Sequence, residues 1–376
     1  MKIRTVQIAV IAGLLSSSAS IALAQSIKIG LASVMTGPVA LIGQQSKEGA
    51  ELRVRQINAA GGVLGRKLEL VVADHACDPA QGINAVSKLM SDEVTAIIGS
   101  ACSSVTLATM PLIQRNEVVQ LEYLGTNPKI TGGAGKGGNP WQFRLNIDDG
   151  IMVEALSKYI AGKVKSVAII AQNDEYGRGA AAQFRGFLEP AGVKVVSMDF
   201  ATSGTPDYRP IITKIKGLAP EGLVAVMDSP NAAPLALQTA EMEFKPQVFG
   251  RGTVVTPAFQ NLVKNPAIWN GAVEVNRWVD NPQAGDFAKA FQEAYKLPPE
   301  LNNAMAYYAV EVLADAIKRA GSTDRKAVRA ALVSANLKIP GLGPVRFDAN
   351  NQAHPDMFLI QWQDGKIRLL DRRATE

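Results

Sequence analysis

The sequence alternates short apolar, β-branched runs with longer segments of helical periodicity. In the first part of the chain, strands are expected at 27–31, 67–72 and 95–98, and helices at 41–59, 80–90 and 104–115. After a glycine-rich loop at 131–140, strands are expected at 164–171, 193–200 and 223–227, and helices at 151–161, 180–191, 208–218 and 232–242. Because strands that alternate with crossover helices form parallel sheets, the pattern predicts two α/β cores.

The last third of the chain is mainly helical before it becomes strand-like. Helices are expected at 286–295, 302–320 and 324–334, followed by β-like segments at 357–362 and 366–370. With 376 residues and 47% hydrophobic content, the chain is long enough for two ordinary domains.

The N-terminus has the three parts of a secretory signal. Lys2 and Arg4 precede an apolar run at 6–15, and a Ser/Ala-rich stretch then ends at Ala24. A membrane anchor needs about 20 continuous apolar residues, whereas this run stops at the serines 16–18. We therefore expect cleavage after Ala24 and an exported mature chain.

The composition excludes several classes of function. A net charge of +5 is too weak for a nucleic-acid groove. Two Cys and two His cannot build a zinc-finger or iron–sulfur framework, so we expect no metal and no cofactor. In an oxidising compartment one disulfide between Cys77 and Cys102 is favoured, although two unrelated buried thiols remain an alternative.

No catalytic motif has support from its spacing. The glycines at 133–138 fit G-x-G-x-x-G, but Asn139-Pro140 and a strand-like pattern follow them, so we interpret the segment as a surface loop. A serine hydrolase would need His75 or His354 as its base, and no G-x-S-x-G elbow is present. The acid pairs 148–149 and 174–175 are interpreted as solvated helix starts.

Two strand ends suggest a site for a small anion. The segment 99–106 follows an apolar strand and opens a helix, where free N–H groups and the hydroxyls of Ser103, Ser104 and Thr106 suit a carboxylate. The alternative is that Ser103 or Ser104 merely caps the helix. The segment 123–128 forms a second such edge.

Several stretches together carry a family resemblance: 27–30 with 36–40, 57–65, 74–78, 97–104, 174–177 and 205–208. Over essentially the whole mature chain, the sequence resembles the periplasmic branched-chain amino-acid-binding (Leu/Ile/Val-binding) proteins of ABC transporters. The resemblance implies an α/β type I periplasmic-binding fold, with two doubly wound parallel-sheet lobes joined by a three-segment hinge. It also places the family's disulfide on Cys77 and Cys102.

The resemblance further implies boundaries for the two lobes. Lobe 1 is expected at 25–145 plus 276–350, and lobe 2 at 146–275 plus 351–376, with hinge crossings near 144–148, 273–277 and 347–355.

Binding residues also follow from the resemblance. A ligand carboxylate would lie against Ser103, Thr126, Ala101 and Leu124, beside Ser104 at the same helix start, and Tyr176 matches a binding tyrosine of the second lobe. The chain departs from the leucine-type pattern in three places: Gly252 stands where a glutamate holds the ligand ammonium, 228–231 replaces a tyrosine, and Ile42 replaces an aromatic residue. We expect Asp228 to supply the missing negative charge, or Arg251 to bind a second acidic group.

The sequence thus predicts a non-catalytic periplasmic protein that captures an amino acid, aliphatic or branched-chain, for an inner-membrane ABC permease. One alternative ligand is an amine-free carboxylate such as an aromatic acid. An alternative of another class is an exported α/β hydrolase. We expect a monomer that binds no nucleic acid.

Overall fold

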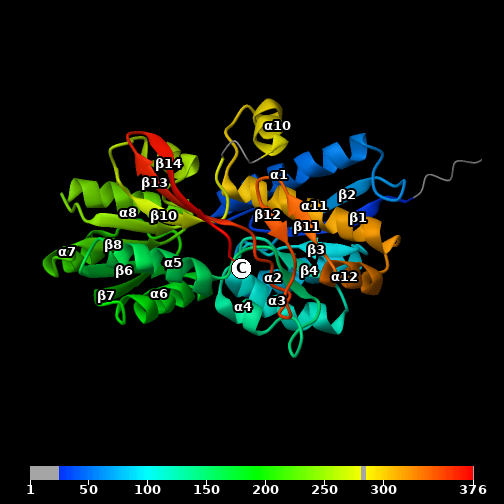
Figure 1. The fold of residues 1–376 in the computed structure, drawn as a ribbon, viewed down its shortest axis with the longest axis horizontal. Coiled ribbons are helices and arrows are strands. Elements are labelled where there is room, and N and C mark those ends of the chain that lie inside the picture. The colour runs from blue at the N-terminus through cyan, green and yellow to red at the C-terminus, as the bar shows by residue number, and fades with distance from the viewer. Residues whose placement is uncertain (1–24, 281–284, 376) are drawn as a thin grey trace, which may run out of the picture.

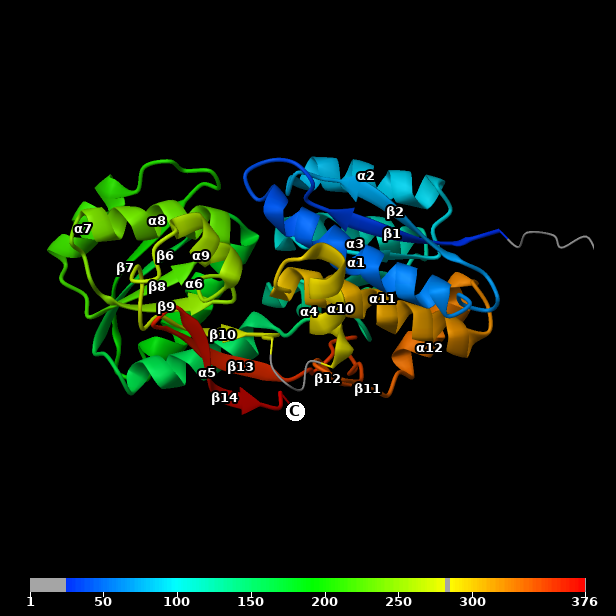
Figure 2. The same ribbon diagram turned by 90° about the horizontal axis from the view of Figure 1, so that it is seen from above.

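The described residues form two large sheets, each covered by helices, that lie side by side as two lobes (Figures 1 and 2). This computed structural model describes residues 25–280 and 285–375. The expected signal segment, 1–24, lies outside the described residues. Within the described ranges, no helix is both long and apolar enough to cross a bilayer.

The first lobe contains a five-stranded parallel sheet in the order β2-β1-β3-β4-β5. Its strands are β1 (Ile27–Ser33), β2 (Leu68–Asp74), β3 (Ala96–Ile98), β4 (Gln120–Glu122) and β5 (Gln142–Arg144). Its helices are α1 (Ala40–Ala59), α2 (Pro79–Ser91), α3 (Ser103–Arg115), α4 (Pro128–Gly132), α10 (Asp286–Tyr295), α11 (Leu301–Ala320) and α12 (Arg325–Val333). All three residues of β3 are fully buried, as expected for a central parallel strand with helices on both faces.

The second lobe contains a seven-stranded sheet in the order β14-β13-β10-β9-β8-β6-β7. Its strands are β6 (Ser166–Gln172), β7 (Lys194–Ala201), β8 (Gly222–Val226), β9 (Gln247–Arg251), β10 (Val273–Asn276), β13 (Met357–Gln363) and β14 (Lys366–Arg373). Its helices are α5 (Asp149–Ala161), α6 (Glu175–Leu188), α7 (Arg209–Gly217), α8 (Ser229–Glu241) and α9 (Pro257–Val263). β13 pairs antiparallel with both β10 and β14, so β13 runs opposite to the parallel strands and β14 runs in their direction.

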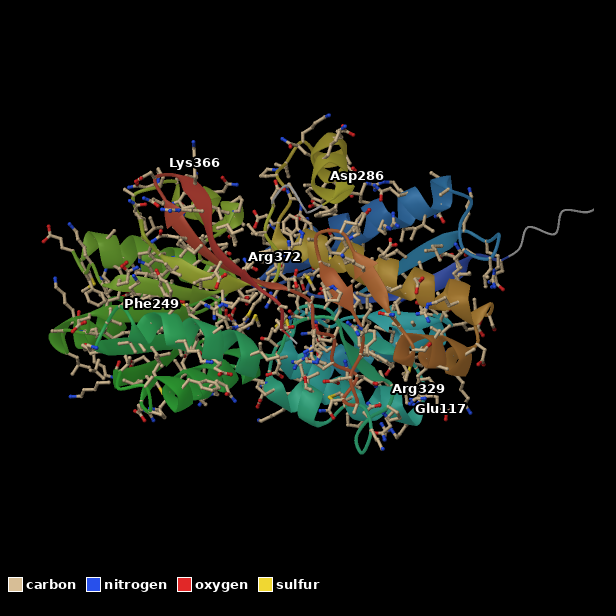
Figure 3. The ribbon with its side chains drawn as sticks, in the orientation of Figure 1. Glu117, Phe249, Asp286, Arg329, Lys366 and Arg372 are labelled. Carbon is tan, nitrogen blue, oxygen red and sulfur yellow. A yellow bond between two sulfur atoms is a disulfide. The ribbon has the colours of Figure 1, made fainter. Side chains whose placement is uncertain are left out.

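Alternate residues of the second sheet pack into different cores. Val167 and Ile169 of β6 belong to the cluster that includes α5 and α6, whereas Ala168 and Ile170 belong to the cluster that includes α7, α8 and α9. Phe249 is fully buried in this lobe, while Glu117 and Lys366 are exposed (Figure 3). The two-residue side-chain period of a strand therefore builds a core on each face.

The chain passes between the sheets three times: after β5, after β10, and between β12 (Gly343–Val345) and β13. β12 pairs only with β11 (Leu337–Ile339) in a small separate sheet. The predicted fold class, two doubly wound α/β lobes with a three-segment hinge, is confirmed. The second passage begins at Arg277, because 273–276 is a strand of the second sheet.

Most expected elements are present, with shifted ends. α6 begins at Glu175 instead of residue 180, because the Asp174 carboxylate accepts the N–H of Gly177 and caps the helix. The glycine-rich segment 133–138 is a loop, as predicted, with a short bridge between Ala134 and Asn139. β9 and α9 were not expected from the pattern.

The disulfide between Cys77 and Cys102 is present and joins the loop after β2 to the start of α3. His75 lies in the same loop, as predicted, but it is fully buried. Its Nε2 bonds to the Ser100 carbonyl at 2.7 Å, and its Nδ1 accepts the Cys77 N–H. Burial lowers the pKa of His75, so the imidazole serves as a neutral structural link.

Replacing both cysteines, as Cys77→Ser with Cys102→Ser, should lower the free energy of unfolding by about 3 kcal/mol, because the bridge closes a loop that the unfolded chain would otherwise leave free. Urea denaturation measures the loss. Two thiols that react with a maleimide in the native, unreduced protein would contradict the bridge.

Candidate functional site

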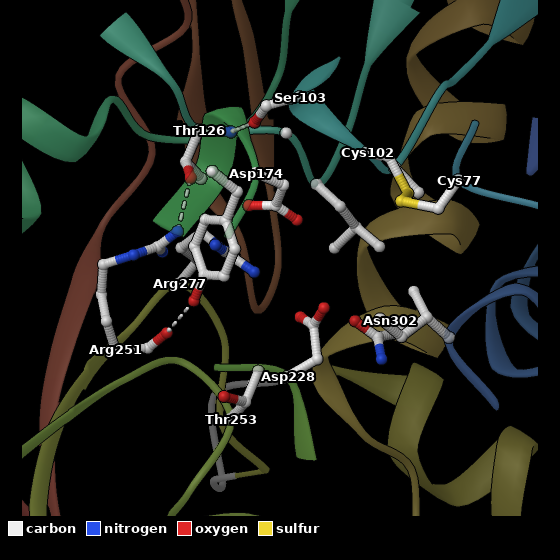
Figure 4. Close-up of a pocket in the computed structure, with 15 residues that line it drawn as sticks. Cys77, Cys102, Ser103, Thr126, Asp174, Asp228, Arg251, Thr253, Arg277 and Asn302 are labelled. Atoms are coloured by element: carbon white, nitrogen blue, oxygen red, sulfur yellow. Dashed lines mark hydrogen bonds between the residues drawn. A yellow bond between two sulfur atoms is a disulfide. The ribbon is translucent and has the colours of Figure 1, made fainter. Parts of the chain in front are cut away.

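A pocket lies between the lobes, where the carboxyl ends of parallel strands face each other (Figure 4). Such edges are the usual place for ligands in open α/β sheets. The lining residues are Ile42, Cys77, Ala101, Cys102, Ser103, Leu124, Gly125, Thr126, Asp174, Tyr176, Asp228, Arg251, Thr253, Arg277 and Asn302.

Six of the seven predicted ligand-binding residues line this pocket: Ala101, Ser103, Leu124, Thr126, Tyr176 and Asp228. Ser104, the seventh, does not line it. The prediction did not include Asp174, Thr253, Arg277 and Asn302. Asp174, Thr253 and Arg277 each follow the end of a second-lobe strand within two residues, and that position is the signal that could have found them.

Ser103 connects the two first-lobe edges. Its hydroxyl oxygen accepts the N–H groups of Thr126 and Asn127, at 3.2 and 3.3 Å. The residue at the helix cap is Cys102, which makes no side-chain cap bond. Neither serine therefore caps α3, and the Ser103 hydroxyl keeps its own proton to donate into the pocket.

Glu122, at the end of β4, takes up most of the backbone donors near this edge. Its buried carboxylate accepts N–H groups from five residues: Ser100, Ala101, Tyr123, Leu124 and Gly125. It also accepts the hydroxyl of Thr106. The N–H groups of Ala101 and Leu124 and the Thr106 hydroxyl, all expected to face an anionic ligand, are therefore bonded within the protein.

Arg251 and Asp149 form an ion pair deep in the site, with 2.9 Å between Nε and Oδ1. Both side chains are buried, at 2% and 0% exposure. Arg251 also donates to the Thr126 hydroxyl of the other lobe and stacks over the Tyr176 ring, with Cζ 4.6 Å from its centroid. Burial raises the pKa of Asp149, and Arg251 opposes that shift.

The interpretation of 148–149 as a solvated helix start is wrong for Asp149. Asp148 does begin the helix, since its carboxylate accepts the Gly150 N–H, and it also pairs with Arg144. Asp149 lies one position further, which turns its side chain inward to Arg251. The sequence alone does not show that Asp149 lies on the side of the helix that faces Arg251, because Arg251 is 102 positions away.

Asp174 and Asp228 form the acidic side of the pocket, and both carboxylates point toward its middle (Figure 4). Gln172 holds them in place, since its amide donates to Asp174 and its Oε1 accepts the Asp228 N–H. Burial raises the pKa of Asp228 to about 6, and the like charge of Asp174 adds to the shift. Asp174 does start α6 as its N-cap, but it also lines the pocket, which the interpretation of 174–175 as a solvated helix start did not include. Glu175 pairs with Lys129 of the first lobe.

Arg277 brings a second guanidinium to the pocket, and it is 5% exposed. Burial lowers its pKa to about 10, and the nearby Arg251 adds to this shift. Arg277 therefore stays protonated at neutral pH. Within the described ranges, no group of three or more His, Cys, Asp or Glu residues is arranged to hold a metal ion.

The pocket is narrow, with a cavity volume of about 40 Å³, and it is not fully enclosed. Bonds between Arg251 and Thr126, Asn127 and Glu175, and Lys129 and Glu175 join the lobes. Entry of a solute therefore requires these groups to move apart.

Comparison with known proteins gives a consistent result. Residues 26–366 match the model of a family described as periplasmic binding protein. The "Leu/Ile/Val-binding protein homolog 3" of Brucella melitensis is 30% identical over 345 residues, covering 91% of this chain and 92% of that protein.

Solved structures share the fold. The branched-chain amino acid transporter substrate-binding protein LivJ of Streptococcus pneumoniae, in complex with isoleucine, superposes with a TM-score of 0.83 at 22% identity and covers 93% of this chain and 99% of its own. An ABC transporter solute-binding protein of R. palustris, in complex with benzoate, has a TM-score of 0.85 at 21% identity and covers 93% and 97%.

Arg251→Met should lower the free energy of unfolding by about 3–5 kcal/mol, because it leaves the buried carboxylate of Asp149 without its partner. Adding Asp149→Asn should recover part of the loss. Lys129→Met is the control, since it removes an exposed ion pair worth less than about 1 kcal/mol. Equal losses in Arg251→Met and Lys129→Met by urea denaturation would contradict the buried pair.

Proposed function

Since the chain belongs to the periplasmic binding protein family, we propose that it is the solute-binding component of an ABC transporter. It captures an amino acid between its lobes and delivers it to an inner-membrane permease. One observation carries the proposal: the interlobe pocket combines hydroxyl groups on one lobe with a pair of carboxylates on the other. An amino acid offers the complementary carboxylate and ammonium.

The acidic pair supports an amino acid as the ligand. Asp174 and Asp228 repel each other, and burial penalises their charge, so a cation placed between them would relieve both effects. The ammonium of an amino acid is such a cation. Leucine, isoleucine and valine, named for the relatives, are the first ligands to test.

An amine-free carboxylate is the second candidate, and a specific feature favours it. Gly252 provides no acidic side chain where the leucine-type pattern has a glutamate, and Arg277 lies beside it. A similar structure binds benzoate. The hydrolase alternative lacks support, because His75 is bonded to Ser100 and His354 pairs with Asp348, and neither lines the pocket.

The proposal includes the processing and division of the chain. Residues 1–24 are removed on export, and the mature protein acts in the periplasm as a monomer. The lobes divide at 145/146, at 276/277 and at 350/351, since the expected boundary 275/276 falls inside β10. An intact mass that begins at Gln25 would support the cleavage site.

A ligand screen tests the proposed function. Leucine, isoleucine, valine and benzoate are added to the mature protein in a thermal-shift assay, because a ligand that binds only the folded state at about 100 times its Kd adds ~2.7 kcal/mol of stability. Small-angle scattering at saturation then measures whether the radius of gyration falls. A protein that neither gains stability with any of these acids nor changes shape would contradict the proposal.

Asp228→Asn should weaken amino-acid binding at pH 7 by at least about 30-fold, equivalent to 2 kcal/mol, because an enclosed ammonium loses its charged partner. Benzoate binding should stay unchanged or improve. Calorimetry measures both, with the exposed Asp207→Asn as control.

The same residue should make amino-acid binding depend on pH. With a pKa of about 6, Asp228 is ionised at pH 7 and mostly protonated at pH 5, so affinity should fall as the pH decreases through 6, by up to about tenfold per unit. In Asp228→Asn this part of the pH dependence should disappear. An affinity profile identical in parent and variant would contradict the role of Asp228.

A further inference from the structure

Arg277 is the starting point, because its buried guanidinium makes no bond to the part of the chain that the structure describes. It follows β10 and lines the pocket with 5% of its surface exposed. Among residues 25–280 and 285–375, no side chain or carbonyl forms an ion pair or hydrogen bond with its guanidinium, and its Nε is enclosed without an acceptor. Burying a charge without a partner carries a desolvation penalty in free energy. An anionic ligand that pairs with Arg277 would offset this penalty.

None of the acids around Arg277 forms an ion pair or hydrogen bond with it within residues 25–280 and 285–375. Asp149 pairs with Arg251. Glu274 accepts the N–H groups of Thr253 and Val254 and the amide of Asn276. Asp174 and Asp228 share the pocket but make no bond to Arg277, and the N-cap bond of Asp174 fixes its direction.

Gly252 leaves the guanidinium uncovered. A Cβ at this position would lie 3.9 Å from each of Cζ, Nη1 and Nη2 of Arg277, so residue 252 faces the plane of the group. Gly252 also has a φ of +85°, a backbone conformation that other residues rarely adopt. An acidic side chain at 252 would pair with Arg277 from within the protein, and glycine prevents this.

The first lobe offers an entering carboxylate little compensation. Glu122 already accepts the N–H groups of Ala101 and Leu124, and Ser103 accepts that of Thr126. The hydroxyl proton of Ser103 remains, and it carries no full charge, whereas the Thr126 hydroxyl accepts from Arg251 and interacts with the Asp149 carboxylate. The positive charge that a carboxylate needs in a closed pocket must therefore come from the second lobe.

We propose that Arg277 binds the carboxylate of the ligand from the second lobe, opposite the hydroxyl of Ser103. The inference rests on the proposed function and specifies its ligand class: small organic acids with a free carboxylate. The two planar N–H groups of a guanidinium match the two oxygens of a carboxylate. Amides of the same acids lack the charge and are rejected.

The test compares acids with their amides in the parent protein and in Arg277→Met. The probes are leucine with leucinamide and benzoate with benzamide, measured by calorimetry at pH 7.5. The parent should prefer the acid that it binds over its amide. Arg277→Met should weaken acid binding by at least about 30-fold, leave the amide nearly unchanged, and so remove the preference. Arg277→Lys, which keeps the charge without the planar fork, should retain part of it.

Stability separates a binding role from a structural one. Without ligand, Arg277→Met should melt no lower than the parent, because the substitution removes an unpaired buried charge. A lower melting temperature in the ligand-free variant would indicate a structural role and overturn the inference.

The outcomes also separate the two proposals. A parent protein that binds neither leucine nor benzoate overturns the proposed function and, with it, this inference. A parent that binds one of these acids, together with an Arg277→Met variant that keeps its affinity and its preference over the amide, overturns the role of Arg277 alone.

Discussion

The parallel strands of each sheet end at one edge, and the two edges face each other across the pocket. This constraint gathers residues that are far apart in the sequence. Asp174, Asp228, Arg251 and Arg277 follow or end four neighbouring strands, so each enters the same small volume. The fold therefore gathers a polar site without any local motif.

The two arginines of this region differ in the groups that compensate their charge. Arg251 has a carboxylate, a hydroxyl of the opposite lobe and an aromatic face, and all three contacts are internal. Among residues 25–280 and 285–375, Arg277 has none of these contacts, and it lies beside a glycine. Because a buried charge must be compensated, the first arginine stabilises the closed protein and the second is suited to a ligand.

Glu122 determines which backbone donors of the first lobe are free to bind a ligand. By accepting five backbone N–H groups, its carboxylate satisfies donors that would otherwise remain unpaired after the ends of β3 and β4. It also places a negative charge close to the expected anion site. Ser103 is left as a hydroxyl donor, while the full positive charges of the site come from the second lobe. In the arrangement that the resemblance implies, first-lobe backbone groups also bind the ligand carboxylate, whereas here Glu122 occupies them.

The sequence by itself determined the local elements, the two α/β lobes, the disulfide and six of the residues that line the pocket. The elements and the two α/β cores follow from periodicity, the disulfide from a pair of cysteines in an exported chain, and most of the pocket residues from the family resemblance. Only the tertiary structure decided that Asp149 is buried against Arg251, that Glu122 takes the N–H groups of Ala101 and Leu124, and that the Arg277 guanidinium makes no bond within the described residues. Asp149 and Arg251 are 102 positions apart, and the direction of the Glu122 side chain depends on how neighbouring strands pack. Such contacts decide the free energy of a charged group in a low-dielectric pocket. The same aspartate or arginine is well solvated in water but destabilises the protein when it is buried without a partner.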